Sequence, residues 1–328
     1  DLDGGSRGFT LFSKNGKVLF KSGNKVEHLV TRIGHYPEDR SENKGNEPEG
    51  VEFGQFGKDS FLFVGSERSS VVAVYQLRHH WPKTKFLQVL PAGVGPEGLL
   101  AIPQRNLFVA ASEVDDRAAK IRSSISIYKR IKGQPTYPTV QSADRADGLP
   151  IPWGALSALA ADPEDPEIAY TVYDSFYRKS RIYTMHVDKN PAQIFSELEL
   201  RDDDDVLIDA LNELKLQLPG TDDFVPADAV NDDGTVNLDP EGIAIGKDGC
   251  FYVASEGSGN LVDGVSDPDN HPFESPNVIV KINADNGLIV QDILLPLELT
   301  RNQFRFGFEG VAEVDDYLYV AFQREWMS

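Results

Sequence analysis

The stretch that decides the fold is residues 240–256. Pro240-Glu241-Gly242-Ile243 opens one short apolar strand, and Cys250-Phe251-Tyr252-Val253-Ala254-Ser255-Glu256 forms a second. The glycines and the aspartate between the two strands predict a turn. The same order of a Glu-Gly pair, a strand, a turn and a strand ending in an acidic residue returns along the chain. Such internal repetition is typical of solenoids, propellers and arrays.

Four further copies of this pattern open at Pro48-Glu49-Gly50-Val51, Pro96-Glu97-Gly98-Leu99, Leu156-Ser157-Ala158-Leu159 and Phe308-Glu309-Gly310-Val311. The first four copies along the chain continue into a third apolar strand, and most continue into a weaker fourth. The sequence therefore predicts an all-β protein, a β-propeller of four-stranded antiparallel blades with insertions. A β-sandwich is the alternative, but it does not explain why the repeats share an opening dipeptide.

The two ends of the chain each resemble half of a blade. Residues 9–20 read as a hairpin, the outer half, and the last copy holds only the inner half. Either the halves pair and residues 1–328 form a single propeller, or the chain is part of a larger one. The longest insertion is the acidic segment 201–239. Its apolar spacing predicts a short helix near 203–218, and the Asp202–Asp205 run is interpreted as a helix start rather than a metal cluster.

Composition excludes several classes of protein. The 328 residues carry a formal net charge of −20, which disfavours nucleic acid and anionic lipid as partners. No apolar run is long enough to span a membrane. The single cysteine, Cys250, cannot form an intramolecular disulfide. The first residues are not a signal peptide, and a processed extracytoplasmic protein, periplasmic or secreted, would begin in this way.

The acidic residues of the repeats are the candidate site. The innermost strand of each propeller blade starts beside the central channel, so the opening residues are expected to converge. This predicts a ring of four glutamates that bind a metal, with the uncharged Ser157 at the fifth position. The four are Glu49, Glu97, Glu241 and Glu309. The acids that close the second strands are expected to form a further ring: Glu67, Glu113, Asp174 and Glu256.

Several carboxylates in one small space stay ionised only when a cation lies among them. Oxygen ligands without histidine or cysteine favour Ca²⁺, with Mg²⁺ or Mn²⁺ as less favoured alternatives. Three interpretations stay open here: a catalytic ion, a structural ion, or no ion, with each glutamate accepting backbone N–H groups of the next blade.

No motif for covalent catalysis is present, since the chain has no Gly-x-Ser-x-Gly elbow, no His-Glu-x-x-His helix and no Walker loop. The candidate general bases are therefore Glu67, Glu113 and Glu256. Arg68 follows Glu67, and Arg324 is expected where the fifth copy would carry its second acid. Either arginine could bind a phosphate group, although ion pairs with the acidic rings are the alternative.

The repeats also resemble known families. The segments 39–51 and 95–100 look like repeats of bacterial secreted choice-of-anchor, alkaline-phosphatase-like propellers. The segments 155–159, 239–244 and 308–312 resemble the "esterase-like activity of phytase" domain. The resemblance implies a propeller, an extracytoplasmic location and phosphoesterase or esterase activity. Ser157 departs from the recurring glutamate, so a fully acidic ring is not expected.

The leading hypothesis is a calcium-dependent hydrolase of phosphate esters with a small anionic substrate. The alternative is a non-catalytic cell-surface or periplasmic scaffold that binds a protein or glycan. Exposed aromatic residues would suit a scaffold, and the candidates are Trp81, Trp153, Tyr137 and Tyr177.

Overall fold

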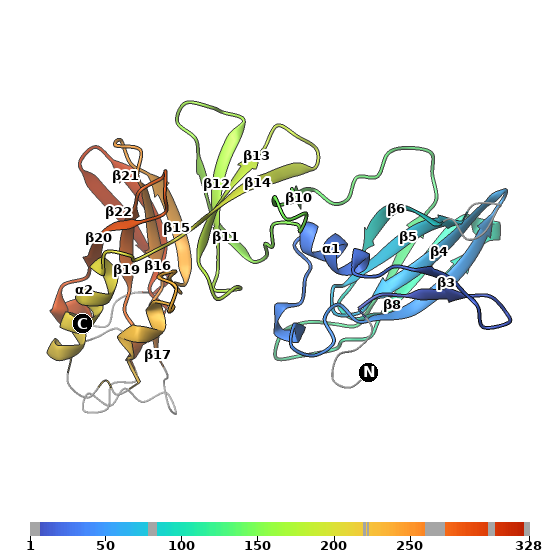
Figure 1. The fold of residues 1–328 in the computed structure, drawn as a ribbon, viewed down its shortest axis with the longest axis horizontal. Helices are drawn as coiled ribbons and strands as arrows, with labels where there is room; N and C mark the ends of the chain where they lie inside the picture. Colours follow the sequence, from blue (N-terminus) through green and yellow to red (C-terminus); the bar gives the residue numbers. More distant parts are fainter. Residues whose placement is uncertain are drawn as a thin grey trace. The chain divides into compact units, whose positions relative to one another are not determined.

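The computed structural model describes residues 7–77, 84–218, 221, 223–259, 273–300 and 306–324. The chain divides into unit 1, Asp1–Trp153 with Asn190–Gln193, and unit 2, Gly154–Lys189 with Ile194–Ser328. Each unit is built from antiparallel sheets (Figure 1). The predicted all-β class is confirmed, and closure of the sheets into one propeller stays a prediction.

Unit 1 holds a four-stranded and a three-stranded sheet. The first contains β3 (Pro48–Phe56), β4 (Asp59–Ser66), β5 (Val71–Leu77) and β6 (Thr84–Pro91), and the second contains β7 (Pro96–Ile102), β8 (Leu107–Ser112) and β9 (Ser124–Lys129). The predicted N-terminal hairpin is present as β1 (Thr10–Phe12) and β2 (Val18–Lys21). The other elements of this unit are α1 (Lys25–Arg32), η1 (Glu38–Arg40), η2 (Pro103–Arg105) and β10 (Val140–Ser142).

Unit 2 continues the series of sheets. The third sheet contains β11 (Leu156–Ala161), β12 (Ile168–Tyr173), β13 (Arg181–His186) and β14 (Ala192–Glu199), and the fourth contains β15 (Pro240–Ile245), β16 (Phe251–Ser255), β19 (Val278–Ile282) and β20 (Ile289–Leu294). Among the described residues the fifth sheet has only the inner pair, as predicted, β21 (Phe308–Val314) and β22 (Tyr317–Phe322). The remaining elements are α2 (Val206–Gln217), η3 (Pro226–Ala229), β17 (Ser258–Gly259), β18 (Phe273–Ser275) and α3 (Leu297–Thr300).

Strand β4 shows how the sequence builds the core of unit 1. Side chains alternate between the two faces of a strand, and both faces of β4 are apolar. Phe61 and Phe63 point toward the second sheet, where the rings of Phe63 and Phe108 stack with centroids 4.0 Å apart. Leu62 and Val64 belong to a separate core cluster on the opposite face. This strand is therefore buried on both sides.

Two helices cover the sheets, one in each unit. In α1, Val26 and Val30 are buried at helical spacing, and Val30 packs against Val71 of β5; this helix was not predicted. The predicted helix of the acidic insertion is present as α2, which lies against β20. The side chain of Asp202 accepts hydrogen bonds from the N–H groups of Leu207 and Ile208, at 2.9 Å each. The aspartate run therefore does start a helix.

All five repeats open with the same β-bulge. In the first repeat Pro48 pairs with Ser66 and Gly50 pairs with Gly65, so the ladder skips Glu49. The skipped residues of the five repeats are Glu49, Glu97, Ser157, Glu241 and Glu309. Bulges re-aim a side chain out of the regular ladder and often lie beside active sites. The repeated dipeptide thus marks one backbone feature.

The glycine of the Glu-Gly pair is explained by close packing of successive first strands. Within the units, β3 lies beside β7, β11 beside β15 and β15 beside β21. A Cβ on Gly50 would lie 2.8 Å from the carbonyl oxygen of Glu97, and a Cβ on Gly242 would lie 2.8 Å from the Cα of Gly310. The opening strands therefore converge within each unit, as the repeat pattern predicts.

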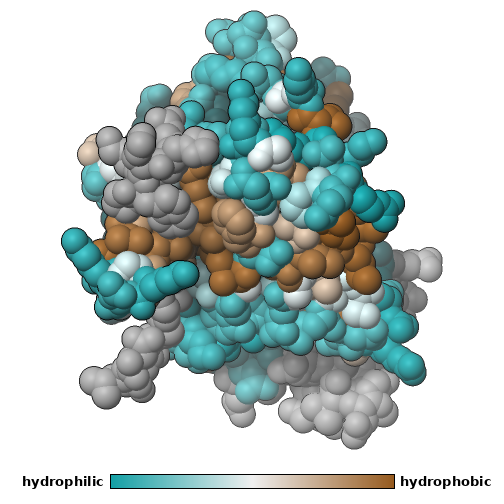
Figure 2. Space-filling model, turned by 90° about the vertical axis from the view of Figure 1, so that its right-hand side faces the viewer, coloured by the Kyte–Doolittle hydropathy of each residue, from teal (hydrophilic) through white to brown (hydrophobic). Residues whose placement is uncertain are grey.

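The surface carries both polar and apolar regions. Figure 2 shows apolar side chains gathered in a broad band on one face of the molecule. Several strands of unit 1 expose large apolar side chains, among them Ile125 and Ile127 of β9, at 68% and 65%. None of the described helices is long and apolar enough to cross a membrane.

Candidate metal centre

The first acidic cluster lies in unit 1. Glu47, Glu49 and Glu67 each place a carboxylate oxygen within 4.8 Å of the others. Glu47 precedes β3, Glu49 is the bulged residue of β3, and Glu67 follows β4. The N–H of Glu67 donates to the carbonyl oxygen of Glu47 at 2.9 Å, which fixes the two chain segments side by side. The repeat geometry therefore assembles this cluster, which is called cluster 1 below.

Three cations neutralise cluster 1. The Arg40 guanidinium lies 2.5 Å from Glu47 Oε1, Arg68 Nε lies 3.5 Å from the same oxygen, and Lys44 Nζ lies 3.8 Å from Glu47 Oε2. Arg68 also pairs with Glu67 at 3.2 Å. Burial alone would raise the pKa of Glu47, but the hydrogen bond from Arg40 and the neighbouring charges outweigh it and hold this pKa below its usual value.

The second acidic cluster, cluster 2, lies in unit 2. Asp174, Asp239 and Glu241 bring one carboxylate oxygen each within 4.8 Å of one another. Asp239 precedes β15, Glu241 is the bulged residue of β15, and Asp174 follows β12 of the neighbouring sheet. The charges of Glu256 and Glu309 act on Glu241 as well. Five carboxyl groups therefore meet around the start of β15.

Cluster 2 has no cation to match those of cluster 1. No described lysine or arginine forms an ion pair with its three central carboxylates. Burial, followed by the charges of the neighbouring acids, raises the pKa of Glu241 to about 8. Burial also raises the pKa of Asp239, which shares a hydrogen bond with Asp174. A bound cation would lower these pKa values and would replace the proton that Glu241 holds below about pH 8.

One oxygen of cluster 2 is left without a hydrogen-bond partner. Asp239 Oδ1 is buried, and no group in the described part of the chain donates to it. An unsatisfied buried carboxylate oxygen costs free energy that coordination to a cation would offset. The site offers carboxylate oxygens and neither histidine nor cysteine, the donor set that Ca²⁺ prefers. The residues present therefore fit a divalent cation.

A cavity of about 760 Å³ adjoins cluster 2. Asp239 and Glu256 form part of its wall. The other polar residues lining it include Ser175, Arg178, Asn237, Ser258 and Glu274. Gly307 donates its N–H to Glu256 Oε1 at 2.8 Å, and burial followed by neighbouring charges raises the pKa of Glu256. The cavity therefore places one acid of raised pKa beside the candidate metal ligands.

The residues of the predicted ring fall into two groups, one in each unit. Unit 1 holds Glu49, Glu97, Glu67, Arg68 and Glu113, and unit 2 holds Glu241, Glu309, Glu256 and Arg324. In unit 1, Glu49 and Glu97 lie close enough for their charges to raise the pKa of Glu67, although burial contributes most. Glu113 is exposed and belongs to neither of the two acidic clusters among the described residues, so its role stays a prediction.

Two sequence assignments are refined by the backbone hydrogen bonds. The residue that closes the second strand donates its N–H to the residue before the first strand, and in the fifth repeat that donor is Gln323. The expectation that Arg324 occupies this place was wrong, and Arg324 instead stacks on Phe306 at 3.9 Å. Ser157 donates its hydroxyl to the carbonyl oxygen of Pro240 at 2.5 Å, a contact that a carboxylate could not make.

Asp239 is the candidate metal ligand that the sequence interpretation missed. It was treated only as part of the motif around Glu241. The signal was nevertheless present, because Asp239-Pro240-Glu241-Gly242 matches Glu47-Pro48-Glu49-Gly50 in the first repeat. In both repeats the acid before the proline lies next to the acid that closes the second strand.

Comparison with known proteins gives two family matches. A phytase-like model described as "Esterase-like activity of phytase" matches residues 151–328, and a choice-of-anchor I domain matches residues 3–80. The search of curated proteins found no match.

Solved structures give only distant likenesses. Hydrazine synthase of Kuenenia stuttgartiensis is 11% identical with a TM-score of 0.23, Sqt1 of Saccharomyces cerevisiae is 10% identical with 0.25, and an exo-β-1,3-galactanase of Phanerochaete chrysosporium is 11% identical with 0.23. These matches cover 76%, 80% and 79% of this chain. They span only 49%, 65% and 53% of the respective structures. Likenesses at such TM-scores carry no information on function.

Proposed function

Since the chain belongs to the phytase-like family described as "Esterase-like activity of phytase", we propose that it is a metal-dependent hydrolase of phosphate esters. The observation that carries the proposal is the contrast between the clusters. Asp174, Asp239 and Glu241 converge without a described cation, and Asp239 keeps a buried oxygen without a partner. Converging carboxylates of this kind, two of them half-buried and one exposed, are typical of a site that binds a cation.

In this proposal Asp174, Asp239 and Glu241 hold the ion, with Ca²⁺ as the cation that their chemistry favours. Glu309 adds negative charge at the same place. A divalent cation supplies polarisation of a phosphoryl oxygen and lowers the pKa of water. The predicted participation of Glu49 and Glu97 in the same site stays a prediction.

Glu256 is the general base of the proposed reaction. The N–H of Gly307 holds one of its carboxylate oxygens, which fixes the direction of the side chain. A carboxyl group with a raised pKa is a stronger base once it is ionised, so it accepts a proton from water more readily. Glu256 and Asp239 line the same cavity, so the base and one of the proposed metal ligands face a common space.

Arg178 is the cation placed to bind the substrate. It is exposed, lines the same cavity and has no ion pair with a described acid. A guanidinium group can bind phosphate through two parallel hydrogen bonds. Arg68 is already engaged with Glu47 and Glu67, so its role in binding phosphate stays a prediction from the sequence.

Most of the aromatic residues that would support the scaffold alternative make contacts within the protein. Trp153 donates its indole N–H to the carbonyl oxygen of Arg32 at 2.9 Å, and the hydroxyl of Tyr137 lies 2.5 Å from His35 Nε2. Tyr177 packs edge-on against Tyr173. Trp81 lies outside the described residues. The hydrolase is therefore preferred, and we place it outside the cytoplasm by analogy with the choice-of-anchor match.

The test measures the metal content of protein purified without chelator, together with its melting temperature and its turnover of p-nitrophenyl phosphate. The proposal expects about one calcium per chain and turnover that EDTA abolishes and added calcium restores. Bound calcium with chelator-sensitive melting but no turnover would make the ion structural. Protein that binds no divalent cation would overturn the proposal.

A further inference from the structure

The second sheet of unit 1 lacks a strand that the other full sheets possess. β6, β14 and β20 are the fourth strands of the first, third and fourth sheets, whereas the second sheet ends at β9. One edge of β9 pairs with β8 along its whole length, from Ser124 to Lys129. In the described part of the chain no strand pairs with the other edge. The place of a fourth strand is therefore open there.

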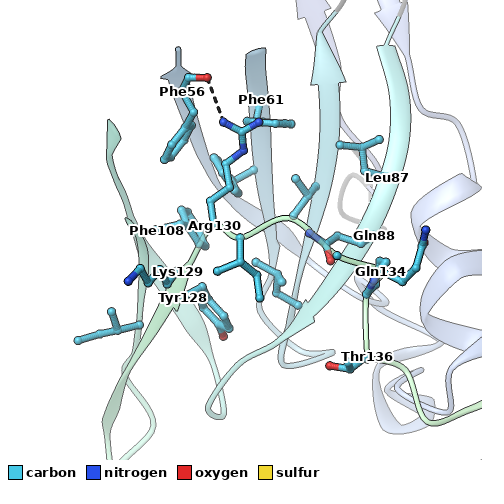
Figure 3. A pocket seen from close by; sticks show the side chains of 17 residues that line it. Phe56, Phe61, Leu87, Gln88, Phe108, Tyr128, Lys129, Arg130, Gln134 and Thr136 are labelled. Carbon is cyan, nitrogen blue, oxygen red and sulfur yellow. Dashed lines mark hydrogen bonds between the residues drawn. The ribbon is translucent and has the colours of Figure 1, made fainter. Parts of the chain in front are cut away.

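The sequence after β9 explains why the segment that directly follows it does not form that strand. Gly133 weakens strand formation, and Pro135 and Pro138 have no N–H group to donate to a ladder. The segment leaves β9 directly and crosses toward β6 (Figure 3). Gln134 and Thr136 of this segment lie on the far side of the space that it crosses. The edge of β9 is thus left available.

A cavity of about 520 Å³ lies between β9 and the face of the first sheet. Its aromatic wall is formed by Phe61, Phe63, Phe108 and Tyr128, and Leu87 and Gln88 of β6 form the opposite side (Figure 3). Side chains of an added strand would alternate between this cavity and the exposed face that carries Ile125. The cavity therefore offers apolar contacts to every second residue of such a strand.

The charges around the cavity define the partner. Arg130 is already occupied, because it donates to the carbonyl oxygen of Phe56, pairs with Asp59 and lies over the ring of Phe61. Lys129 and Lys132 are exposed, and neither has an ion pair with a described acid. These two ammonium groups lie at the same edge and are not balanced by a described acid, so locally they favour carboxylates on a bound segment.

We propose that the free edge of β9 and the adjoining cavity bind an extended acidic segment of a partner protein as the fourth strand of the second sheet. Main-chain hydrogen bonds to β9 provide affinity, and the aromatic cavity selects apolar residues at alternate positions. Lys129 and Lys132 pair with carboxylates of the segment. This site is separate from cluster 2 and independent of the proposed hydrolysis.

The probe is a fluorescein-labelled, acetylated peptide with the sequence of residues 192–199, the fourth strand of the third sheet, which carries two glutamates. Fluorescence anisotropy measures its binding to the full chain. The comparison peptide has the same sequence with N-methyl groups on alternate residues, which removes backbone donors without changing charge. The proposal expects binding of the first peptide and at least about tenfold weaker binding of the second, equivalent to about 1.4 kcal/mol.

The protein variant is Lys129→Glu with Lys132→Glu, both at exposed positions, and we expect about tenfold weaker binding, since two attractive pairs become repulsive. The matched control is Lys14→Glu with Lys17→Glu, which makes the same change in charge in the β1–β2 turn and should bind within twofold of the unchanged chain. Amide exchange in residues 124–129 should slow when peptide binds. No binding at about 1 mM peptide, or equal binding of the N-methylated peptide, would overturn the proposal.

A second copy of the chain is the competing occupant of the edge. Sedimentation measurements without peptide distinguish it, because the proposal expects a species whose mass is unaffected by the Lys129→Glu and Lys132→Glu changes. A dimer that these changes dissociate would overturn the proposal in favour of self-association.

Discussion

Clusters 1 and 2 are built on the same backbone plan and differ in how their charge is balanced. Each combines an acid before a proline with a bulged glutamate, and the third acid closes a second strand, that of the same sheet in cluster 1 and that of the neighbouring sheet in cluster 2. Cluster 1 is surrounded by Arg40, Arg68 and Lys44, and cluster 2 has no described ion pair. The comparison shows that repeated acids do not define a metal site, because an acid with its own cation needs no ion.

The largest expected effect comes from Glu241→Gln. Changing a residue outside the metal's ligand set typically lowers activity or affinity about 10- to 100-fold, so loss of a ligand should lower turnover about 100-fold or more. Glu49→Gln, at the equivalent bulge of unit 1, should keep turnover within about threefold if the comparison holds. The measurement is kcat for p-nitrophenyl phosphate at saturating calcium.

Glu164→Gln is the matched control for this pair, since Glu164 is exposed in the turn after β11. An equal loss in the Glu49 and Glu241 variants would support the single acidic ring predicted from the sequence and would break the contrast between the clusters.

The second effect is a change in stability that has opposite signs in the two clusters when one acid of each is neutralised. Glu47→Gln removes charge-assisted hydrogen bonds from a buried carboxylate and should lower the free energy of unfolding by about 2 kcal/mol. Asp239→Asn removes a negative charge from a group of acids and should raise the melting temperature in EDTA. Thermal denaturation of both variants checks the prediction, and a lower melting temperature for Asp239→Asn in EDTA would contradict it.

The third effect is a pH dependence that calcium abolishes. The pKa of Glu241 in the folded chain is about 8, and the unfolded value is about 4.3. Between these values the folded state binds more protons than the unfolded state, so stability falls as pH rises. Melting temperatures recorded from about pH 5 to 8.5 should decline in EDTA and flatten with calcium, which favours the ionised form. The same decline in both solutions would contradict a cation at cluster 2.

The fold was predictable where the sequence repeats. The five opening strands, the N-terminal hairpin and the helix of the acidic insertion all follow from local patterns. Helix α1 was missed although Val26, Val30 and Ile33 lie at helical spacing, because the segment is short and has no repeat counterpart.

The site was predictable only in part, because charge balance depends on neighbours distant in the chain. The sequence marked Glu49 and Glu241 as equivalent. It did not show that Arg68 returns to Glu47 across a strand turn, nor that Asp174 of the third sheet reaches Asp239 of the fourth. Partners of this kind are set by the packing of sheets against each other and not by local spacing.

The smallest effect concerns Ser157, the uncharged residue at the edge of cluster 2. Ser157→Ala removes its hydrogen bond to Pro240 and should cost about 1 kcal/mol of stability. Its hydroxyl is not among the proposed ligands, so calcium affinity measured by titration calorimetry should change by less than about twofold, which is less than about 0.4 kcal/mol. A large loss of affinity would add the opening residue of the third repeat to the ligands of cluster 2.

The shared bulge has a consequence for how such a protein can change over time. Since the bulged residue stands outside the strand ladder, the strand pairing accepts more than one residue type there, and glutamate and serine both occur. The adjoining glycine of the Glu-Gly repeats and the backbone hydrogen bond keep the strands in place. Each repeat therefore presents one position whose side chain can differ while the strands around it stay paired. Over evolution a metal ligand can be gained, lost or exchanged at one of these positions while the sheet keeps its strand pairing.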